Sequence, residues 1–260
     1  MELPTISVLM PCYNNSKYIL EAVQSVLGQT WRDLELVIVD DASTDTSVAN
    51  VESIGERRIR LVRNEKNRGI AAVRNQLLSL ARGRYVSSLD GDDIYRSPDK
   101  LATELRLMQS MNRNSIVYSD VELIDGQGAV LSRASQSMPT REGILFQGLL
   151  DRTIMIPRDF LVSSELARSV GGFDENLAIY EDWDYKLRLA QRAHFVYTGQ
   201  IGIGYRRHGG GLSSASKKVH RHCREWIRCK YGIQGFDNTA VKWLQMAIGR
   251  TESRAYTKAA

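Results

Sequence analysis

The amino-acid sequence predicts an α/β fold, in which one mixed and mostly parallel sheet is flanked by helices. Short apolar segments rich in β-forming residues alternate with helical segments from residue 5 to residue 119. The connections between them are short, which is typical of parallel strands covered by helices on both faces. With 260 residues, 43% hydrophobic and 25% charged, the chain has an ordinary globular composition and is long enough for one large domain.

Buried strands and amphipathic helices follow one another through the first half. The expected strands cover residues 5–10, 34–39, 59–62, 85–89 and 115–119. The expected helices cover residues 19–27, the segment after Asp45, residues 70–81, and a segment from Pro98 to about residue 111. Apolar residues recur there at helical spacing, and Pro98 lies in a first helical turn, where proline is favoured.

The pattern changes after residue 120. Residues 121–125 and 129–133 flank Gly126-Gln127-Gly128 and predict an antiparallel hairpin. Residues 134–160 are irregular. The remaining expected elements are helices at 165–170 and 181–193, strands at 195–198 and 201–205, and terminal helices at 215–231 and 238–249. We therefore expect one domain over residues 1–212 and a C-terminal helical extension over residues 213–260.

The charge balance and the cysteines narrow the class of protein. Thirty-five Lys and Arg against thirty Asp and Glu give a net charge of +5, which fits anionic partners. The three cysteines form no CxxC pair, which argues against a disulfide scaffold or a zinc ribbon and favours a reducing compartment. No signal peptide and no run of ~20 apolar residues is evident. We expect a cytoplasmic protein that is at most peripheral on the inner face of a membrane.

Two common nucleotide-binding fingerprints are missing. Gly126-x-Gly128 is followed by Leu131 where a dinucleotide-binding loop needs its third glycine. Gly209 is followed by Gly210 where a phosphate-binding P-loop needs lysine. Dinucleotide binding and P-loop phosphoryl transfer both lose support.

Acidic residues end two of the predicted strands. Asp40-Asp41 follows the second strand, and Asp90-Gly91-Asp92-Asp93 follows the fourth. In open α/β sheets, ligands bind beyond the carboxyl ends of the strands. Asp90 and Asp92 project to one side if the extended backbone continues, and their oxygens suit Mg²⁺ or Mn²⁺ carrying a diphosphate. An acidic turn that caps the next helix is the alternative.

Six ordered segments together resemble family 2 glycosyltransferases, which adopt the GT-A fold. They are residues 6–14 (ISVLMPCYN), Gln29-Thr30 with residues 36–45 (LVIVDDASTD), residues 67–75 (NRGIAAVRN), residues 89–93 (LDGDD), residues 171–175 (GGFDE) and residues 180–184 (YEDWD). The resemblance covers about residues 5–210 and implies inverting transfer of a sugar from a nucleotide-diphosphate donor, with a UDP-linked donor expected. Synthesis of a surface polysaccharide or another glycan is the implied role.

The resemblance also implies a nucleotide site. The expected nucleotide-binding residues are Pro11, Tyr13, Asn14, Asp41, Arg68, Asp90 and Gly91. Asp41 would accept a hydrogen bond from a uracil ring, whereas Asp40 is better explained as a turn cap. Tyr13 could also be a packed loop aromatic. Gly91 would let a ligand approach the backbone closely.

The same resemblance implies a metal site for Mn²⁺ or Mg²⁺. Asp90 and Asp92 match the metal-binding DxD motif, and His208 is the expected third protein ligand. Arg206 or Arg207 would neutralise the leaving diphosphate. The glycines at 209–211 suggest a lid that closes over the donor, with a glycine-rich surface loop as the alternative.

Asp182 matches the catalytic base of the family. The acceptor hydroxyl must lose a proton as it attacks the anomeric carbon, and a carboxylate can take that proton. Asp182 also lies at the start of a predicted helix, where an acidic residue can simply cap the helix. Glu181 would orient the acceptor or be another acid of the first turn. Trp183 would stack on the acceptor or belong to the core.

The segment 217–230 (KKVHRHCREWIRCK) is strongly basic, with Val219, Cys223, Trp226 and Ile227 on one helical face. A surface helix packed on the domain is the plainer interpretation. The alternative is an interfacial helix that contacts anionic lipids near a lipid-linked acceptor. A glycan acceptor without a lipid is equally compatible with the sequence.

Three other functions fit less well. A sugar-phosphate nucleotidyltransferase would need a glycine-rich basic loop after the first strand, which residues 11–15 (PCYNN) do not supply. A nucleic-acid-binding module built on the basic segment leaves the acidic strand ends unexplained, so we expect no nucleic-acid partner. A catalytically silent sugar-nucleotide binder would have no need for Asp182 beside Asp90 and Asp92.

Overall fold

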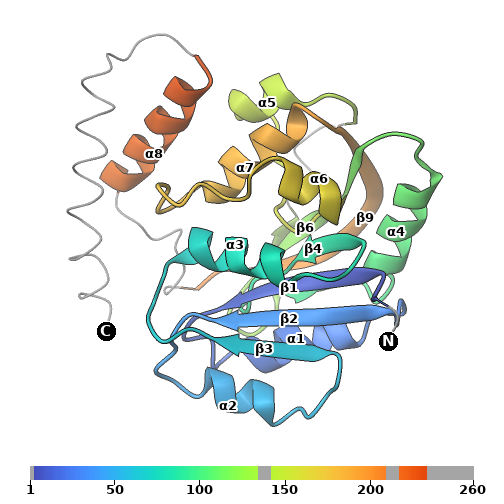
Figure 1. The fold of residues 1–260 in the computed structure, drawn as a ribbon, viewed down its shortest axis with the longest axis vertical. Helices are drawn as coiled ribbons and strands as arrows, with labels where there is room; N and C mark the ends of the chain where they lie inside the picture. The colour runs from blue at the N-terminus through green and yellow to red at the C-terminus, as the bar shows by residue number, and fades with distance from the viewer. Residues whose placement is uncertain (1–2, 134–141, 209–216, 233–260) are drawn as a thin grey trace.

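A computed structural model describes residues 3–133, 142–208 and 217–232 of the chain. Within these residues, nine strands form one sheet in the order β3-β2-β1-β4-β8-β6-β9-β5, and β7 pairs with β6 (Figure 1). The strands are β1 (Ile6–Cys12), β2 (Leu34–Asp40), β3 (Ile59–Arg63), β4 (Tyr85–Ser88), β5 (Ile94–Tyr95), β6 (Ser115–Ile124), β7 (Val130–Arg133), β8 (Leu161–Ser163) and β9 (His194–Arg206). The helices are α1 (Ile19–Leu27), α2 (Ser47–Glu52), α3 (Ile70–Leu80), α4 (Lys100–Ser110), α5 (Phe146–Leu150), α6 (Ser164–Ser169), α7 (Glu181–Ala190) and α8 (Lys217–Lys230).

The sheet has a parallel half and a mixed half. Strands β3, β2, β1 and β4 are all parallel. Strand β8 is antiparallel to both β4 and β6, and it joins the parallel half to the parallel pair β6 and β9. The predicted mixed, mostly parallel sheet is therefore confirmed.

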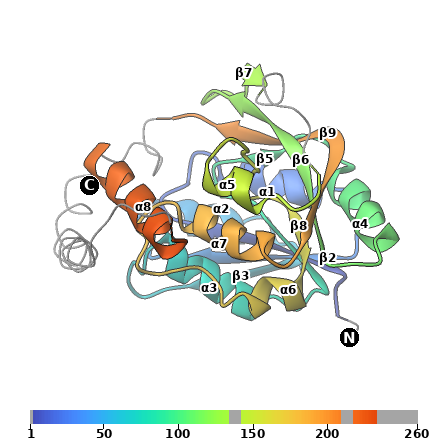
Figure 2. The same ribbon diagram turned by 90° about the horizontal axis from the view of Figure 1, so that it is seen from above.

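Helices cover both faces of the sheet. Strand β1 is buried on both sides, with Val8 and Met10 in one core and Leu9 in the other, as the alternation of a strand requires. One face is covered by helices α1, α2 and α4 (Figures 1 and 2). The core on the other face contains residues of helices α3, α5, α6, α7 and α8.

Most predicted elements are confirmed, with differences in the mixed half. The segments predicted at 195–198 and 201–205 are one strand, β9, because it pairs with β6 throughout, across register shifts near Asp120. Strand β6 likewise spans the predicted gap at residue 120, and its hairpin with β7 is confirmed. The short elements β5, α5 and β8 were not predicted. The helix predicted at 238–249 lies outside the described residues.

Helix α8 packs against the domain. Cys223 and Ile227 are buried in the same core as α7, and Val219 and Trp226 pack against that core. The apolar face predicted from the sequence is therefore covered by protein, as the plainer interpretation proposed. No helix among the described residues is long and apolar enough to cross a bilayer. The domain boundary at residue 212 stays a prediction.

Candidate active site

The predicted site residues gather at the carboxyl edge of the parallel half. Pro11 belongs to the end of β1, Asp41 follows β2, and Asp90 and Asp92 follow β4. Arg68 lies two residues before α3. This edge is where open α/β sheets bind their ligands, and the topology brings residues far apart in the sequence to it.

Three carboxylates after β4 form an acidic cluster. One oxygen each of Asp90, Asp92 and Asp93 lies within 4.8 Å of the other two. Asp92 remains partly exposed, at 23% of its side chain, and its Oδ2 lies 2.9 Å from Nε2 of His208. Of the residues predicted to hold a metal, Asp92 and His208 are thus in direct contact, and Asp90 lies beside them.

Two arginines that the sequence interpretation did not single out hold Asp90. Arg74 Nη2 lies 2.9 Å from Oδ1 of Asp90, and Arg158 Nη2 lies 2.7 Å from Oδ2. Arg158 also donates to Asp93 at 2.6 Å. Since both oxygens of Asp90 face guanidinium groups, Asp92 is the carboxylate of the cluster that is better placed for a cation.

Asp93, the third carboxylate of the cluster, is bonded to the buried Arg206. Asp93 is fully buried, and its Oδ1 accepts from the backbone N–H of Arg206 at 2.8 Å. Burial, which outweighs the attraction of Arg158, raises the pKa of Asp93. Arg206 is itself buried and donates through Nε, Nη1 and Nη2 to the Asp92 carbonyl, the Asp125 carbonyl and the Glu21 carboxylate.

The predicted diphosphate contact of Arg206 needs correction for this reason. All three guanidinium nitrogens of Arg206 bond within the protein, which gives this residue a structural role. Arg207 is exposed, and its guanidinium lies 5.0 Å from the ring centre of Tyr205. Only Arg207 of the two offers its charge to solvent. The glycines at 209–211 lie outside the described residues.

Asp182, the predicted base, lies in the first turn of α7. Its Oδ2 accepts from Lys186 Nζ at 3.0 Å, and 26% of its side chain is exposed. Burial opposes ionisation, but Lys186, Arg158 and Arg74 outweigh it and hold the pKa of Asp182 below its ordinary value. Asp182 is therefore a carboxylate at neutral pH. It lines one pocket together with Pro11, Arg74 and Arg158.

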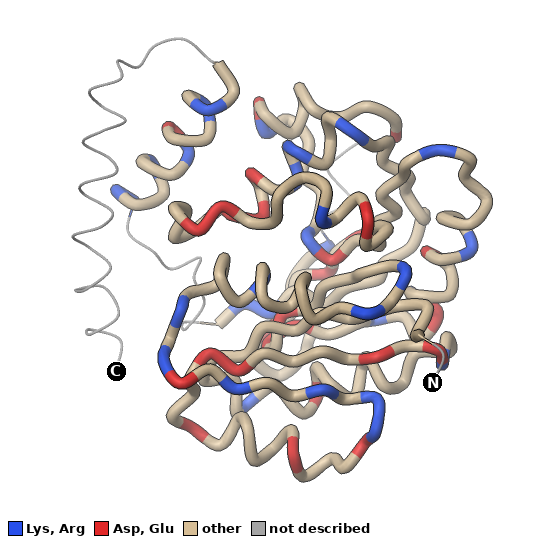
Figure 3. Tube along the Cα trace, viewed as in Figure 1, with Lys and Arg blue, Asp and Glu red and all other residues tan. Residues whose placement is uncertain are grey.

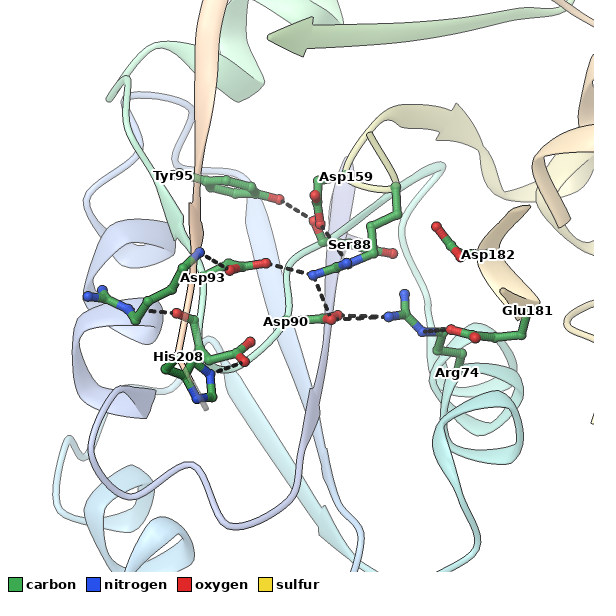
Figure 4. A network of polar contacts seen from close by, with 12 residues as sticks. Arg74, Ser88, Asp90, Asp93, Tyr95, Asp159, Glu181, Asp182 and His208 are labelled. Atoms are coloured by element: carbon green, nitrogen blue, oxygen red, sulfur yellow. Dashed lines mark hydrogen bonds and ion pairs between the residues drawn. The ribbon is translucent and has the colours of Figure 1, made fainter. Parts of the chain in front are cut away.

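Glu181 is the buried neighbour of Asp182. Its Oε1 lies 3.3 Å from Nε of Arg74, which is close enough for an ion pair although Nε makes no hydrogen bond there. Burial and the negative charge of Asp182, opposed by Arg74, raise the pKa of Glu181 to about 7. Figure 4 shows Arg74 between Asp90 and Glu181, so one guanidinium links the acidic cluster to the helix that carries Asp182.

Trp183 faces away from the site. It is 6% exposed, and its indole N–H donates to the Leu149 carbonyl at 2.8 Å. Of the two alternatives for Trp183, the structure therefore agrees with the core residue and not with a surface that stacks on the acceptor.

Some of the predicted nucleotide-binding residues are exposed, and others shape the loops at the carboxyl edge of the sheet. Tyr13 is 42% exposed after β1. The neighbouring Asn14 has a positive φ and accepts from the Thr44 N–H through Oδ1 at 2.9 Å. A Cβ at position 91 would lie 3.0–3.2 Å from Ile19, Asn15 and the Pro11 carbonyl. A side chain at position 91 would therefore crowd its neighbours within the protein, which is a reason for glycine there that does not depend on a ligand.

Asp40 and Asp41 both brace loops. Asp40 accepts from the Ser43 N–H, as a turn cap does. The carboxylate of Asp41 accepts from the N–H groups of Arg68 and Gly69 and from the side chain of Asn64, at 2.9–3.0 Å. Since these bonds occupy both oxygens of Asp41, the structure uses it to fix the start of α3. Its contact with a base ring stays a prediction.

Arg74 and Arg158 are the residues that sequence reasoning missed. Arg74 carried a usable signal, because Ala71, Arg74 and Leu78 share one buried face of α3, where an arginine needs an acidic partner. Arg158 carried none, since it lies in a segment without periodicity, and only the fold brings it to Asp90.

The acidic cluster fits a divalent cation. Its ligand atoms are carboxylate oxygens, which Mg²⁺ and Mn²⁺ favour, and Asp92 and His208 are both partly exposed. Asp93 is the poorest candidate ligand because both its oxygens already accept from Arg158 and Arg206. The residues that would hold a metal are therefore Asp92 and His208, with Asp90 beside them.

The parallel half with acidic residues at its carboxyl edge, joined to a mixed half that carries Asp182, defines an α/β protein of the GT-A type. The chain belongs to the family described as glycosyl transferase family 2, whose model matches residues 7–171. The structure superposes on that of S. aureus TarS 1-349 in complex with UDP-GlcNAc with a TM-score of 0.71, covering 98% of this chain and 73% of that chain at 20% identity. The predicted fold class is confirmed.

Two relatives from Escherichia coli are similar in sequence. Chondroitin synthase is 32% identical over 217 residues, which are 81% of this chain and 30% of that protein. The UDP-Glc:alpha-D-GlcNAc-diphosphoundecaprenol beta-1,3-glucosyltransferase WfgD is 33% identical over 162 residues, 60% of this chain and 63% of that protein. The chain spans about a third of the length of several relatives, including 37% of an uncharacterized glycosyltransferase of Rickettsia felis.

Proposed function

We propose that this chain is an inverting glycosyltransferase that moves a sugar from a nucleotide-diphosphate donor to an acceptor hydroxyl. The observation that carries the proposal is that the acidic cluster and the carboxylate of Asp182, which come from distant segments of the chain, lie in one region of the structure. The acidic cluster after β4 and Asp182 on α7 lie at one edge of the sheet, and Arg74 and Arg158 stand between them. Membership of glycosyl transferase family 2 supports the same activity.

A UDP-linked donor is the proposed substrate. Two proteins support it by their names, TarS in its complex with UDP-GlcNAc and WfgD with its UDP-Glc donor. Tyr13, Asn14 and Pro11 would contact the nucleoside from the end of β1 and the loop that follows it, where the Asn14 N–H donates to Ser43. Arg207 would face the diphosphate, since Arg206 is committed to the protein interior.

A divalent cation, Mn²⁺ or Mg²⁺, is the proposed cofactor. Asp92 and His208, with Asp90 beside them, would hold the ion, whose charge offsets that of the departing diphosphate. Arg74 and Arg158 hold Asp90 from the opposite side and keep the cluster in position.

Asp182 is the proposed catalytic base. The acceptor oxygen forms a bond to the anomeric carbon while the bond from that carbon to the diphosphate oxygen breaks, and the acceptor proton passes to Asp182. The positive charges of Lys186, Arg158 and Arg74 keep Asp182 ionised and ready to accept the proton. Glu181 would steady the acceptor side through Arg74.

The proposed setting is the synthesis of a surface polysaccharide or another glycan at the inner face of a membrane. The names of chondroitin synthase and of WfgD, whose acceptor is diphosphoundecaprenol-linked, support it. The proposed acceptor is therefore a glycan or a lipid-linked sugar. Because the apolar face of α8 is covered by the core, any membrane contact of α8 would have to use its charged side chains.

A thermal-shift panel tests the donor proposal. Purified chain is heated with UDP-, GDP-, dTDP- and CMP-sugars, each with and without Mn²⁺. We expect a metal-dependent rise in Tm with the UDP-sugars, and we expect Asp92→Asn to lose the part that depends on metal. Glu165→Gln, an exposed carboxylate on α6, is the matched control and should behave as the unchanged chain does. No shift with any sugar nucleotide would contradict the proposal.

A further inference from the structure

The first half of α8 forms a basic groove that the proposed chemistry does not use. The groove is lined by Tyr180, Lys217, Lys218, His220, Arg221 and Arg224. Lys217, Lys218 and Arg221 are exposed, and Arg224 is half-buried. Figure 3 shows basic residues distributed along α8. Among the residues that the structure describes, no acidic side chain lines this basic groove.

The two halves of α8 differ in how their charges are compensated. Near its end, Lys230 lies 3.0 Å from Asp174 and 2.9 Å from Asp184, and these ion pairs fasten the helix to the domain. In the basic groove, the one carboxylate of the described residues within ion-pair distance of Arg221 is that of Glu225 on its own helix, at 3.8 Å. Within the described part of the chain, Lys217 and Lys218 have no carboxylate within ion-pair distance. Their positive charges are therefore available to an anion.

Arg224 and Tyr180 bring hydrogen-bond donors to the same place. Arg224 Nη1 lies 3.5 Å from the Tyr180 hydroxyl, which also lies 2.9 Å from Nδ1 of His220. No carboxylate of the described residues lies within ion-pair distance of Arg224. An anion in the groove would thus meet ammonium, guanidinium and hydroxyl groups together, a combination that suits the several oxygens of a phosphate group.

The groove adjoins the proposed base. Tyr180 is the residue before α7 and has a left-handed backbone with φ of +68°, which is unfavourable for a bulky residue. Its ring packs against Trp183 and His220, with ring centres 5.9 and 5.5 Å apart. Asp182 follows two residues later, so the two Cα atoms are at most ~7 Å apart. An anion held at Tyr180 would therefore lie near the start of α7, the helix that carries Asp182.

The position of the groove is fixed by packing. Cys223 and Ile227 of α8 are 1% and 0% exposed and belong to the core that also contains Ile179, the residue before Tyr180. The basic side chains therefore project from a helix that is anchored beside the start of α7, and the anion site would not have to be assembled on binding.

We propose that the basic groove binds a phosphate group carried by the sugar acceptor, either a diphosphate or a phosphodiester. This inference rests on the proposed function, because it places the acceptor hydroxyl near Asp182. Two sources share the chemistry, a phosphate on a lipid headgroup and a phosphate on a soluble acceptor. The phosphate oxygens accept from Lys218, Arg221 and Arg224, and the attached sugar extends towards Asp182.

Titration calorimetry with inorganic pyrophosphate in EDTA tests the groove directly. The double variant Lys218→Gln/Arg221→Gln should weaken pyrophosphate binding at least tenfold, because it removes two exposed groove charges. The control Arg106→Gln/Arg113→Gln removes two exposed charges at and beyond α4, at the opposite side of the molecule, and should stay within twofold of the unchanged chain (Figure 1). Equal weakening in both double variants would overturn the proposal, as would none in the groove variant.

Two further measurements separate the outcomes. UDP binding with Mn²⁺ should be unchanged in the groove variant and weakened in Asp92→Asn, whereas pyrophosphate binding in EDTA should survive Asp92→Asn. Failure of the unchanged chain to bind UDP would therefore count against the proposed function but not against the anion site in the groove. A flotation assay with phosphatidylglycerol vesicles identifies the source of the phosphate. If the chain floats with the vesicles and pyrophosphate releases it, the phosphate belongs to a lipid headgroup. If the chain binds pyrophosphate but does not float, the phosphate belongs to a soluble acceptor.

Discussion

Two charge networks meet just before β8, where the dipeptide Arg158-Asp159 contributes to both. Arg158 reaches Asp90 and Asp93 in the candidate site. The carbonyl of Asp159 accepts from Lys100, which pairs with Glu104 at 2.8 Å. Lys100 and Glu104 have no exposed side-chain area, and Ser119 donates to the remaining oxygen of Glu104. This second network is closed, whereas the candidate site keeps its carboxylates partly exposed.

The difference shows what distinguishes a structural charge network from a functional one. In the closed network of Lys100 and Glu104, each charge meets a partner inside the protein, so it can only stabilise or destabilise the fold. In the site network, Asp90, Asp92 and Asp182 keep 20%, 23% and 26% of their side chains exposed. Arg74 and Arg158 hold Asp90, His208 contacts Asp92 and Lys186 donates to Asp182, while solvent or a ligand reaches the outer faces of these carboxylates.

The largest expected effect of a single change is on transfer by the site network. Asp182→Asn should lower the rate of sugar transfer by ~10²–10⁴-fold, because the amide cannot accept the acceptor proton. Its oxygen can still accept from Lys186, so donor binding should change little, whereas loss of the negative charge beside Lys186, Arg158 and Arg74 should lower Tm. A coupled assay of UDP release measures the rate. Asp151→Asn, an exposed carboxylate after α5, is the control. Transfer by Asp182→Asn at the unchanged rate would remove Asp182 as the base.

The closed network should respond in stability alone. Lys100→Met leaves the buried Glu104 carboxylate with only Ser119, and we expect a loss of about 3–5 kcal/mol in the free energy of unfolding. Urea unfolding followed by circular dichroism measures it, and Lys66→Met, an exposed site, should have little effect.

A second variant sharpens this prediction. Lys100→Met/Glu104→Met removes both charges and should recover at least half of the loss, since an apolar pair often replaces a buried ion pair without cost. A double variant that is less stable than Lys100→Met would mean that the network has a role beyond charge compensation. UDP binding by either variant, measured below its unfolding transition, should match that of the unchanged chain.

The two halves of the sheet also differ in how much of them the sequence predicted. In the parallel half, strands β1 to β4 and helices α1 to α4 follow from local apolar periodicity, and the acidic strand ends follow from strand direction. In the mixed half, β5 has two residues and pairs only with the distant β9, so no local pattern marks it. The same distance explains the site. Asp92 and Asp182 stand in recognisable motifs, but the contact of Arg158 with Asp90 exists only after the chain has folded.

Bonds made on folding also changed the predicted roles of single residues. The sequence places Arg206 near a diphosphate but cannot show that Glu21, 185 residues away, takes one of its donors. In the same way, the sequence places Asp41 at a strand end but cannot show that the N–H groups of Arg68 and Gly69 donate to its carboxylate, and its contact with a base ring stays a prediction. Charge and spacing are visible in the sequence, whereas competition for a partner is decided by tertiary contacts.

The smallest expected effect is a pH dependence of the free energy of unfolding that comes from Glu181 in the site network. Burial and the charge of Asp182 raise the pKa of Glu181 to about 7, above its ordinary value of 4.5, although Arg74 opposes the shift. Between pH 4.5 and 7 the folded chain keeps this proton while the unfolded chain loses it. Glu181 therefore lowers the free energy of unfolding as pH rises through this window, by up to about 3 kcal/mol.

Glu181→Gln should remove this contribution, because the amide does not titrate. Denaturant unfolding at pH 4.5 and pH 7.5 should show a smaller decrease in stability for Glu181→Gln than for the unchanged chain, and Glu165→Gln should follow the unchanged chain. Asp182 works in the opposite direction, since its lowered pKa adds stability that is lost only as pH falls below its ordinary range. Parallel curves for Glu181→Gln and the unchanged chain would mean that Arg74 holds Glu181 ionised. The site network would then be as fully compensated as the pair of Lys100 and Glu104.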